Sequence, residues 1–251
     1  FGLLMQPMGI DKGFSRETFS LAFAIQNLVW GLGAPLFGAL SDKYGSGRTI
    51  ALGALLYAIG LASMAYADSA AMLYLSAGVL IGLGQSGTTF GVILGVVARA
   101  VPLEKRSLAL GMASAGGSMG QFLMVPFGQQ LIAQFDWHTA LLVLSVVAGF
   151  GMPLATLLRG KTVHAADQAH QSLSAAFRQA LAHRSYHFLF WSFFVCGFHT
   201  AFITLHLPSY VVDRGLSAFD GAMAIALIGL FNVIGSYGCG WLGGRRSKKN
   251  L

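Results

Sequence analysis

The chain has 251 residues, of which 55% are hydrophobic and only 10% charged, with 33 glycines and a formal net charge of +7. This composition is too apolar for a soluble domain and suits packed transmembrane helices, so we expect a polytopic membrane protein. The basic residues lie in short loops between apolar segments, where they set orientation, and this argues against a nucleic-acid-binding protein.

The chain begins with an apolar piece, residues 1–10, of about half the length that a bilayer crossing needs. It lacks an initiator Met and the layout of a signal peptide, so we expect a truncated chain that starts within a helix. After polar residues 11–15 come seven apolar segments of membrane-crossing length. These predicted spans are 17–40, 49–67, 72–98, 108–134, 139–158, 186–212 and 219–242.

A polar turn between the first two full spans contains Gly38, Asp42, Lys43, Gly45 and Arg48. Its glycines are expected to let backbones approach closely. Asp42 follows a helix end, where the helix dipole disfavours an anion, so we expect a positive group to face it. The pattern Gly-x-x-x-Asp-Lys-x-Gly, followed by a basic residue, resembles the loop between the second and third helices of major facilitator superfamily transporters. The resemblance implies a gating role for the turn.

The distribution of basic residues predicts the orientation. Loops on one side of the predicted membrane hold 13 of the 16 Lys and Arg residues, whereas the other side holds only Lys12, Arg16 and Arg214. Because cytoplasmic loops carry the excess of positive charge, the first side is expected to be cytoplasmic. The long polar stretch 159–184 then becomes a cytoplasmic linker, and its part 172–182 is expected to form an amphipathic surface helix.

The end of the last span repeats features of the first polar turn. Gly240 lies 202 residues after Gly38, and Arg245 falls where Lys43 does, although Gly244 replaces Asp42. Lys248 and Lys249 complete this second basic turn. Six spans, a linker and a degenerate repeat predict a duplicated architecture.

The resemblance covers the whole chain and implies an all-α membrane protein with the major facilitator fold. The chain would supply part of helix one through helix eight of twelve helices. Residues 1–158 would form the first six-helix bundle, 159–184 the linker, and 185–251 the first two helices of the second bundle. The resemblance also implies a monomer in the plasma or inner membrane, which moves a small solute by alternating access.

Three segments are similar to monocarboxylate porters and oxalate/formate antiporters: residues 7–17, residues 197–210 and the Asp136-Trp137 turn. This similarity implies a small organic monocarboxylate as substrate and leaves proton coupling, symport and antiport open. Members of those groups typically hold the carboxylate with a basic residue, often in helix eight. The span 219–242 contains no Lys or Arg, so the counter-charge has to come from elsewhere.

Histidines are the only ionisable side chains, cysteine and tyrosine aside, that the predicted spans carry at depth. His199 and His206 are two helical turns apart and share a face, so they are candidates for substrate or proton binding, with interhelical hydrogen bonding as the alternative. Other polar residues within the spans are candidates for the solute pathway or for packing hydrogen bonds. They are Gln6, Gln26, Asn27, Gln85, Thr89, Ser118, Gln121 and Asn232.

Glycines at a spacing of four residues predict flat helix faces for close packing. These sets are Gly87 with Gly91 and Gly95, Gly78 with Gly82, and Gly116 with Gly120. Cys196 and Cys239 lack metal-ligand spacing and a disulfide framework, so neither a metal nor a cofactor is expected.

One alternative is an enzyme. The run Gly84-Gln-Ser-Gly87 matches the Gly-x-Ser-Gly of intramembrane serine proteases, with Ser86 as nucleophile and His199 as base. The two basic turns, the linker and the repeat have no reason to exist in such a protease, so a transporter without enzymatic activity is preferred.

Overall fold

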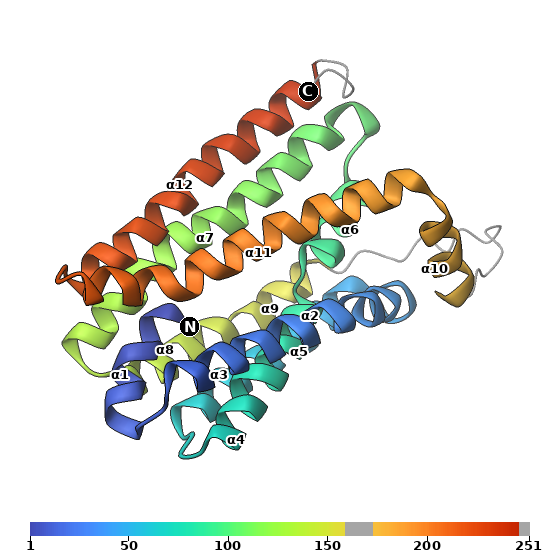
Figure 1. The fold of residues 1–251 in the computed structure, drawn as a ribbon. Coiled ribbons are helices and arrows are strands. Elements are labelled where there is room, and N and C mark those ends of the chain that lie inside the picture. The colour runs from blue at the N-terminus through green and yellow to red at the C-terminus, as the bar shows by residue number, and fades with distance from the viewer. Residues whose placement is uncertain (159–172, 246–251) are drawn as a thin grey trace.

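The computed structural model describes residues 1–158 and 173–245, and within these residues it contains helices and turns but no strand. Seven helical segments of this part of the chain are long and apolar enough to cross a membrane (Figure 1), which confirms the predicted number of spans. Their bounds are Arg16–Tyr44, Ser46–Ala65, Ala70–Ala98, Leu103–Gln134, Trp137–Ala155, Arg184–Asp213 and Ala218–Gly243.

The first six-helix half begins with the short helix α1, which corresponds to the predicted partial span. The remaining elements follow closely along the chain, and several spans are made of more than one helical piece. The elements are α1 (Gly2–Lys12), α2 (Arg16–Tyr44), α3 (Ser46–Ala65), α4 (Ala70–Leu73), the π-helix η1 (Tyr74–Leu80), α5 (Ile81–Gly87), α6 (Phe90–Ala100), η2 (Leu103–Lys105), α7 (Arg106–Gln134), α8 (Trp137–Gly149), α9 (Gly151–Ala155) and η3 (Thr156–Leu158).

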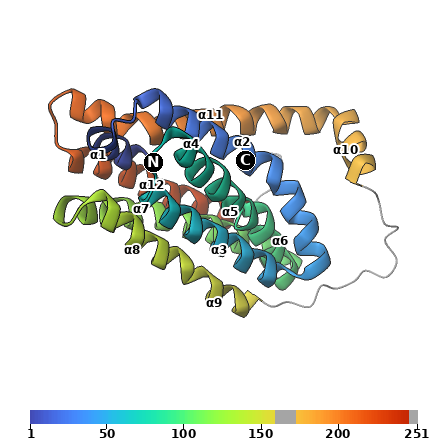
Figure 2. The same cartoon turned by 90° about the horizontal axis from the view of Figure 1, so that it is seen from below.

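Three further helices follow the linker: α10 (Leu173–Ala182), α11 (Arg184–Asp213) and α12 (Ala218–Gly243). Helix α10 coincides with the predicted amphipathic segment, while most of the remaining linker lies outside the described residues. In Figure 2, α11 runs along one side of the molecule, and α8 and α9 run along the opposite side.

Polar side chains at the helix ends explain where several spans begin. Ser15 accepts a hydrogen bond from the backbone N–H of Thr18 at the start of α2, and Asp136 does the same for Thr139 at the start of α8. Ser217 and Asp220 form a reciprocal capping box on α12. The bond from the Thr139 N–H favours the carboxylate form and lowers the pKa of Asp136 below its usual value.

The span Ala70–Ala98 is irregular, and this corrects one prediction from glycine spacing. Between α5 and α6 the chain leaves the helix, and the Thr89 side chain accepts a hydrogen bond from Gly91 N–H to begin α6. Gly87 therefore ends one helix, against Gly53 of α3, while Gly91 and Gly95 belong to the next. The predicted continuous face of Gly87, Gly91 and Gly95 does not exist.

The other two glycine predictions have opposite outcomes. Gly78 and Gly82 pack against α2, because an added methyl group would lie 2.8 Å from the Ile25 side chain and 2.8 Å from the Gln26 carbonyl oxygen, respectively. By contrast, a methyl group on Gly116 or Gly120 would meet no heavy atom of another helix within 4 Å in the described structure. The prediction of a packing seam at those two positions is wrong for this part of the protein.

The two halves meet along α7 and α12, which lie side by side and antiparallel (Figure 1). Close backbone contacts extend along this pair, with Gly229 against Ser118 and Gly240 against Gly111. A second contact joins α1 to α11, where Ser209 donates a hydrogen bond to the Met5 sulfur at 3.4 Å. The first bundle is thus attached to the second through α1 and α7.

Candidate functional site

A hollow of about 520 Å³ lies between the two halves and contains the predicted site residue Asn232. Its walls come from α6 and α7 of the first half and from α12 of the second half. The lining residues are Leu94, Leu110, Gly111, Ser114, Asn232, Gly235, Ser236, Cys239 and Gly240. We refer to this set as the α12 hollow. Its polar side chains are an amide, two hydroxyls and a thiol, all of which can form hydrogen bonds with a small solute.

Sequence reasoning missed Ser114 and Ser236 of the α12 hollow. Ser236 lies four residues after Asn232, so the two share one helix face, and this spacing could have identified Ser236. Ser114 becomes relevant only because α7 packs along α12, a pairing that local sequence patterns do not contain.

Ser118 and Gln121, also predicted as pathway residues, lie at the helix contact, and their part in a solute pathway stays a prediction. The Gln121 amide nitrogen donates to the backbone oxygen of Ile225 at 3.3 Å. The backbone oxygen of Ser118 is 3.0 Å from the position of a methyl group on Gly229. Both residues therefore take part in the contact between α7 and α12. This arrangement fits the alternative in which polar residues within the spans serve helix packing.

Gln26 and Gln85 form a hydrogen-bonded pair within the first half. The Gln26 amide nitrogen donates to the Gln85 side-chain oxygen at 2.7 Å, and the Gln26 side chain is 4% exposed. The carbonyl oxygen of the Gln26 side chain is buried and has no hydrogen-bond partner in the described structure. The neighbouring candidate Asn27 donates to the backbone oxygen of Phe23, one turn earlier on α2.

Gln6 of α1 lines a second cavity, of about 430 Å³, between α1, the start of α2 and the end of α11. Gln6 and Arg16 supply its polar side chains. The apolar part of its wall comes from Met5, Gly9, Ile10, Phe14 and Val212. We call this space the outer cavity, because it lies at the membrane side with few basic residues.

An ion pair beside the outer cavity joins the two halves. The guanidinium of Arg16 makes two hydrogen bonds to the Asp213 carboxylate, Nη1 to Oδ2 at 2.6 Å and Nη2 to Oδ1 at 2.7 Å. Arg16 begins α2 and Asp213 ends α11. The sequence assigned Arg16 to the outer side but gave no sign of its partner, which is 197 positions away.

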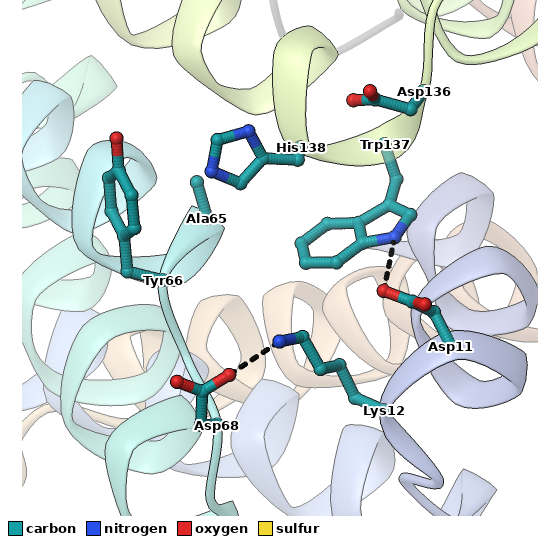
Figure 3. A pocket seen from close by; sticks show the side chains of 8 residues that line it. All are labelled: Asp11, Lys12, Ala65, Tyr66, Asp68, Asp136, Trp137 and His138. Atoms are coloured by element: carbon teal, nitrogen blue, oxygen red, sulfur yellow. Dashed lines mark hydrogen bonds and ion pairs between the residues drawn. The ribbon is translucent and has the colours of Figure 1, made fainter.

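A third cavity, of about 460 Å³, lies within the first half at the same outer side (Figure 3). Lys12 pairs with Asp68 there, and the Trp137 indole nitrogen donates to Asp11 at 3.2 Å. The hydrogen bond to Asp68 raises the pKa of Lys12 above its usual value. These contacts connect α1 to the loop before α4 and to the first residue of α8, and they do not involve the second half. Among the described residues, no group of three His, Cys, Asp or Glu side chains could hold a metal ion.

His199 and His206 lie two turns apart on α11, as predicted, and neither lines any of the cavities described above. His199 is exposed, and its Nδ1 lies 2.9 Å from the backbone oxygen of Val195. His206 is half-buried, with its ring centroid 5.0 Å from that of Phe202. Their role in substrate or proton binding stays a prediction.

The structure does not support the protease alternative. Ser86 is fully buried, and its hydroxyl contacts the backbone oxygens of Trp30 at 3.1 Å and Gly82 at 3.0 Å. It thereby joins α5 to α2, whereas His199 is exposed on α11 in the second half. A serine tied to backbone carbonyls, away from the proposed base, is a packing residue.

The basic turn at Gly38 to Arg48 lies between α2 and α3. Gly45 has a φ of 94°, a left-handed conformation that favours glycine, and it lets α3 begin directly after α2. A methyl group on either Gly38 or Gly45 would meet no other segment within 4 Å in the described structure, so the expected close backbone approach is found at neither glycine. Asp42, Lys43 and Arg48 are all exposed.

The second basic turn begins at Gly240, which packs against Gly111. The Arg245 guanidinium lies over the Trp241 ring, 4.2 Å from its centroid. Lys248 and Lys249 lie outside the described residues.

Comparison with known proteins identifies a family and several relatives of this chain. The model of the Major Facilitator Superfamily matches residues 1–251. Monocarboxylate transporter 13 of Bos taurus is 29% identical over 226 residues, covering 89% of this chain and 51% of that protein. Monocarboxylate transporter 12 of Mus musculus is 28% identical over 248 residues, covering 86% of this chain and 51% of that protein. The chain therefore spans about half the length of the curated relatives that it matches.

Proposed function

This chain belongs to the Major Facilitator Superfamily, and from that membership we propose that the complete protein is a secondary transporter for a small organic monocarboxylate. The similarity to monocarboxylate transporters 12 and 13 supports the substrate class. Alternating access requires a solute site between two bundles that move against each other. We further propose that the protein acts as a monomer in the plasma or inner membrane, with the linker 159–184 in the cytoplasm.

The observation that carries the proposal is the α12 hollow. Its lining comes from both halves, so movement of one half against the other changes its shape and its access. Asn232, Ser114 and Ser236 can bind a solute through hydrogen bonds. Within residues 1–158 and 173–245, no Lys or Arg lines the hollow, so we propose that another group meets the charge of a carboxylate. His199, His206 and residues outside the described structure are the proposed sources, and a titrating histidine would couple transport to protons.

Uptake by the complete protein in proteoliposomes tests the proposal. We expect saturable uptake of labelled propionate, little uptake of labelled succinate, and none of labelled glucose. Asn232→Leu should reduce propionate uptake, because it removes the amide from the hollow, while Gln130→Leu, at an exposed position on α7, serves as the matched control. Propionate uptake no faster than into empty vesicles would contradict the substrate class.

A further inference from the structure

We propose that the outer cavity is an entry site for small carboxylates with a short apolar tail, and that such a carboxylate opens the outer contact between the halves by replacing Asp213 on Arg16. This inference rests on the proposed function. It assigns the binding of arriving substrate to Arg16 and makes the loss of the contact with Asp213 the opening step. It starts from the paired contacts between Arg16 and Asp213 and from the cavity beside them.

The geometry of the ion pair is the first step. Two parallel N–H···O bonds are the arrangement in which a guanidinium recognises any carboxylate. The Asp213 side chain is therefore chemically equivalent to the proposed substrate. With side-chain exposures of 60% for Arg16 and 42% for Asp213, the pair is open to solvent, and exposed ion pairs exchange partners at little cost.

The outer cavity supplies the second step. Arg16 forms part of its wall, so a carboxylate on the guanidinium would have its tail beside Met5, Phe14 and Val212. A chain of a few carbon atoms gains free energy from burial against these side chains. Gln6, in the same wall, offers an amide for a second polar group. Arg16 is also one of only three basic residues assigned to the outer side by the sequence.

The position of Asp213 gives the consequence. Asp213 ends α11 in the second half, and Arg16 begins α2 in the first half. When Arg16 binds another carboxylate, the two halves lose this contact and retain the weaker bond from Ser209 to Met5 nearby. The same exchange therefore captures the substrate and releases the outer ends of the bundles.

Thiol labelling of the complete protein tests the gate without any transport measurement. Cys196 and Cys239 are replaced by Ser, and Met5→Cys supplies a reporter that is 3% exposed in the closed arrangement. An impermeant maleimide added outside should label the reporter faster in both Arg16→Gln and Asp213→Asn, because either change breaks the pair. Asp68→Asn is the control, since it breaks an outer ion pair within the first half. The gate would be overturned if Asp68→Asn accelerated labelling of the reporter as much as the gate variants do. It would also be overturned if neither gate variant accelerated labelling.

The two gate variants then separate capture from gating. Asp213→Asn leaves the guanidinium free, so external propionate should slow labelling of the reporter, and uncharged propionamide should not. Arg16→Gln opens the same gate without a cation, and the propionate concentration needed for protection should rise about ten- to a hundredfold, the effect of losing a charged hydrogen-bonded contact. Equal protection in both variants would overturn Arg16 as the binding group.

A second reporter guards against a folding defect. Val212→Cys lies on α11 in the same cavity wall and should reproduce every difference seen with Met5→Cys. Protection by propionate in a protein that does not take up propionate would refute the proposed function and leave the entry site standing. Uptake of propionate by the complete protein, with unaltered labelling in both gate variants, would support the proposed function and refute the entry site and its gate.

Discussion

Gly240 of α12 and Gly111 of α7 meet without room for a side chain, because a methyl group built on Gly240 would lie 2.8 Å from the Gly111 α-carbon. This contact fixes the separation of two helices that belong to different halves. It also lies in the wall of the α12 hollow, so the spacing of α7 and α12 defines the shape of the proposed solute site.

Gly240→Ala should therefore destabilise the protein and alter the hollow. The added methyl group meets backbone atoms, which cannot rotate away, and overpacking of this kind costs about 1–3 kcal/mol. Gly238→Ala is the matched control on the same helix, since Gly238 does not line the α12 hollow and its methyl group would meet no other segment within 4 Å in the described structure. Thermal unfolding of the purified complete protein should show a lower midpoint for Gly240→Ala alone. Equal midpoints would mean that α7 and α12 are not held together at this position.

The spans could be predicted from the sequence because membrane thickness sets a length of apolar chain that local composition reveals. The break at Thr89 could not, since it depends on a side-chain cap rather than on hydrophobicity. Glycine spacing predicted contact correctly for Gly78 and Gly82 and wrongly for Gly116 and Gly120, because spacing identifies a flat face but not whether another helix covers it.

The candidate site likewise has a part that could be predicted from the sequence and a part that could not. Asn232 was predictable as a polar residue within a span, whereas the pairing of Arg16 with Asp213 depends on how two separate halves come together. Patterns within one segment carry no information on such a long-range contact.

The predicted orientation can be tested at exposed positions on the two sides. Tyr44, at the end of α2, and Leu216, between α11 and α12, are both exposed, so single cysteines there should be accessible. In a background without Cys196 and Cys239, an impermeant reagent added to intact cells should label Leu216→Cys and spare Tyr44→Cys. The reverse pattern would invert the orientation and place the linker 159–184 outside.

Asp42→Asn should slow transport more than it weakens substrate binding. Asp42 is exposed near the C-terminal end of α2, where the helix dipole disfavours an anion, so its charge is expected to stabilise one gate state through a positive group. Turnover in proteoliposomes and equilibrium binding of labelled substrate measure the two effects separately. Glu104→Gln, which removes an exposed carboxylate at the start of η2, is the control for charge alone. An Asp42→Asn protein with unchanged turnover would remove the gating role.

The last prediction concerns His199 and His206, two of the three histidines within α11. Replacement by Gln keeps a hydrogen-bonding side chain of similar reach but removes the ability to gain a proton near neutral pH. If protonated imidazole supplies the positive charge that the spans otherwise lack, the substitutions should change the pH dependence of monocarboxylate uptake. The change should be larger in the double variant than in either single one. Because His199 is exposed and His206 is half-buried, folding should be largely unaffected.

Uptake is measured from pH 5 to pH 8, with His183→Gln as the matched control, because His183 is an exposed histidine before the first residue of α11. In the wild type, uptake should fall as pH rises, since a neutral imidazole ring no longer attracts a carboxylate. The double variant should lose this fall, while His183→Gln should keep it. A double variant with the wild-type rate and pH profile would reduce both histidines to packing residues, and the coupling group would then have to be another residue.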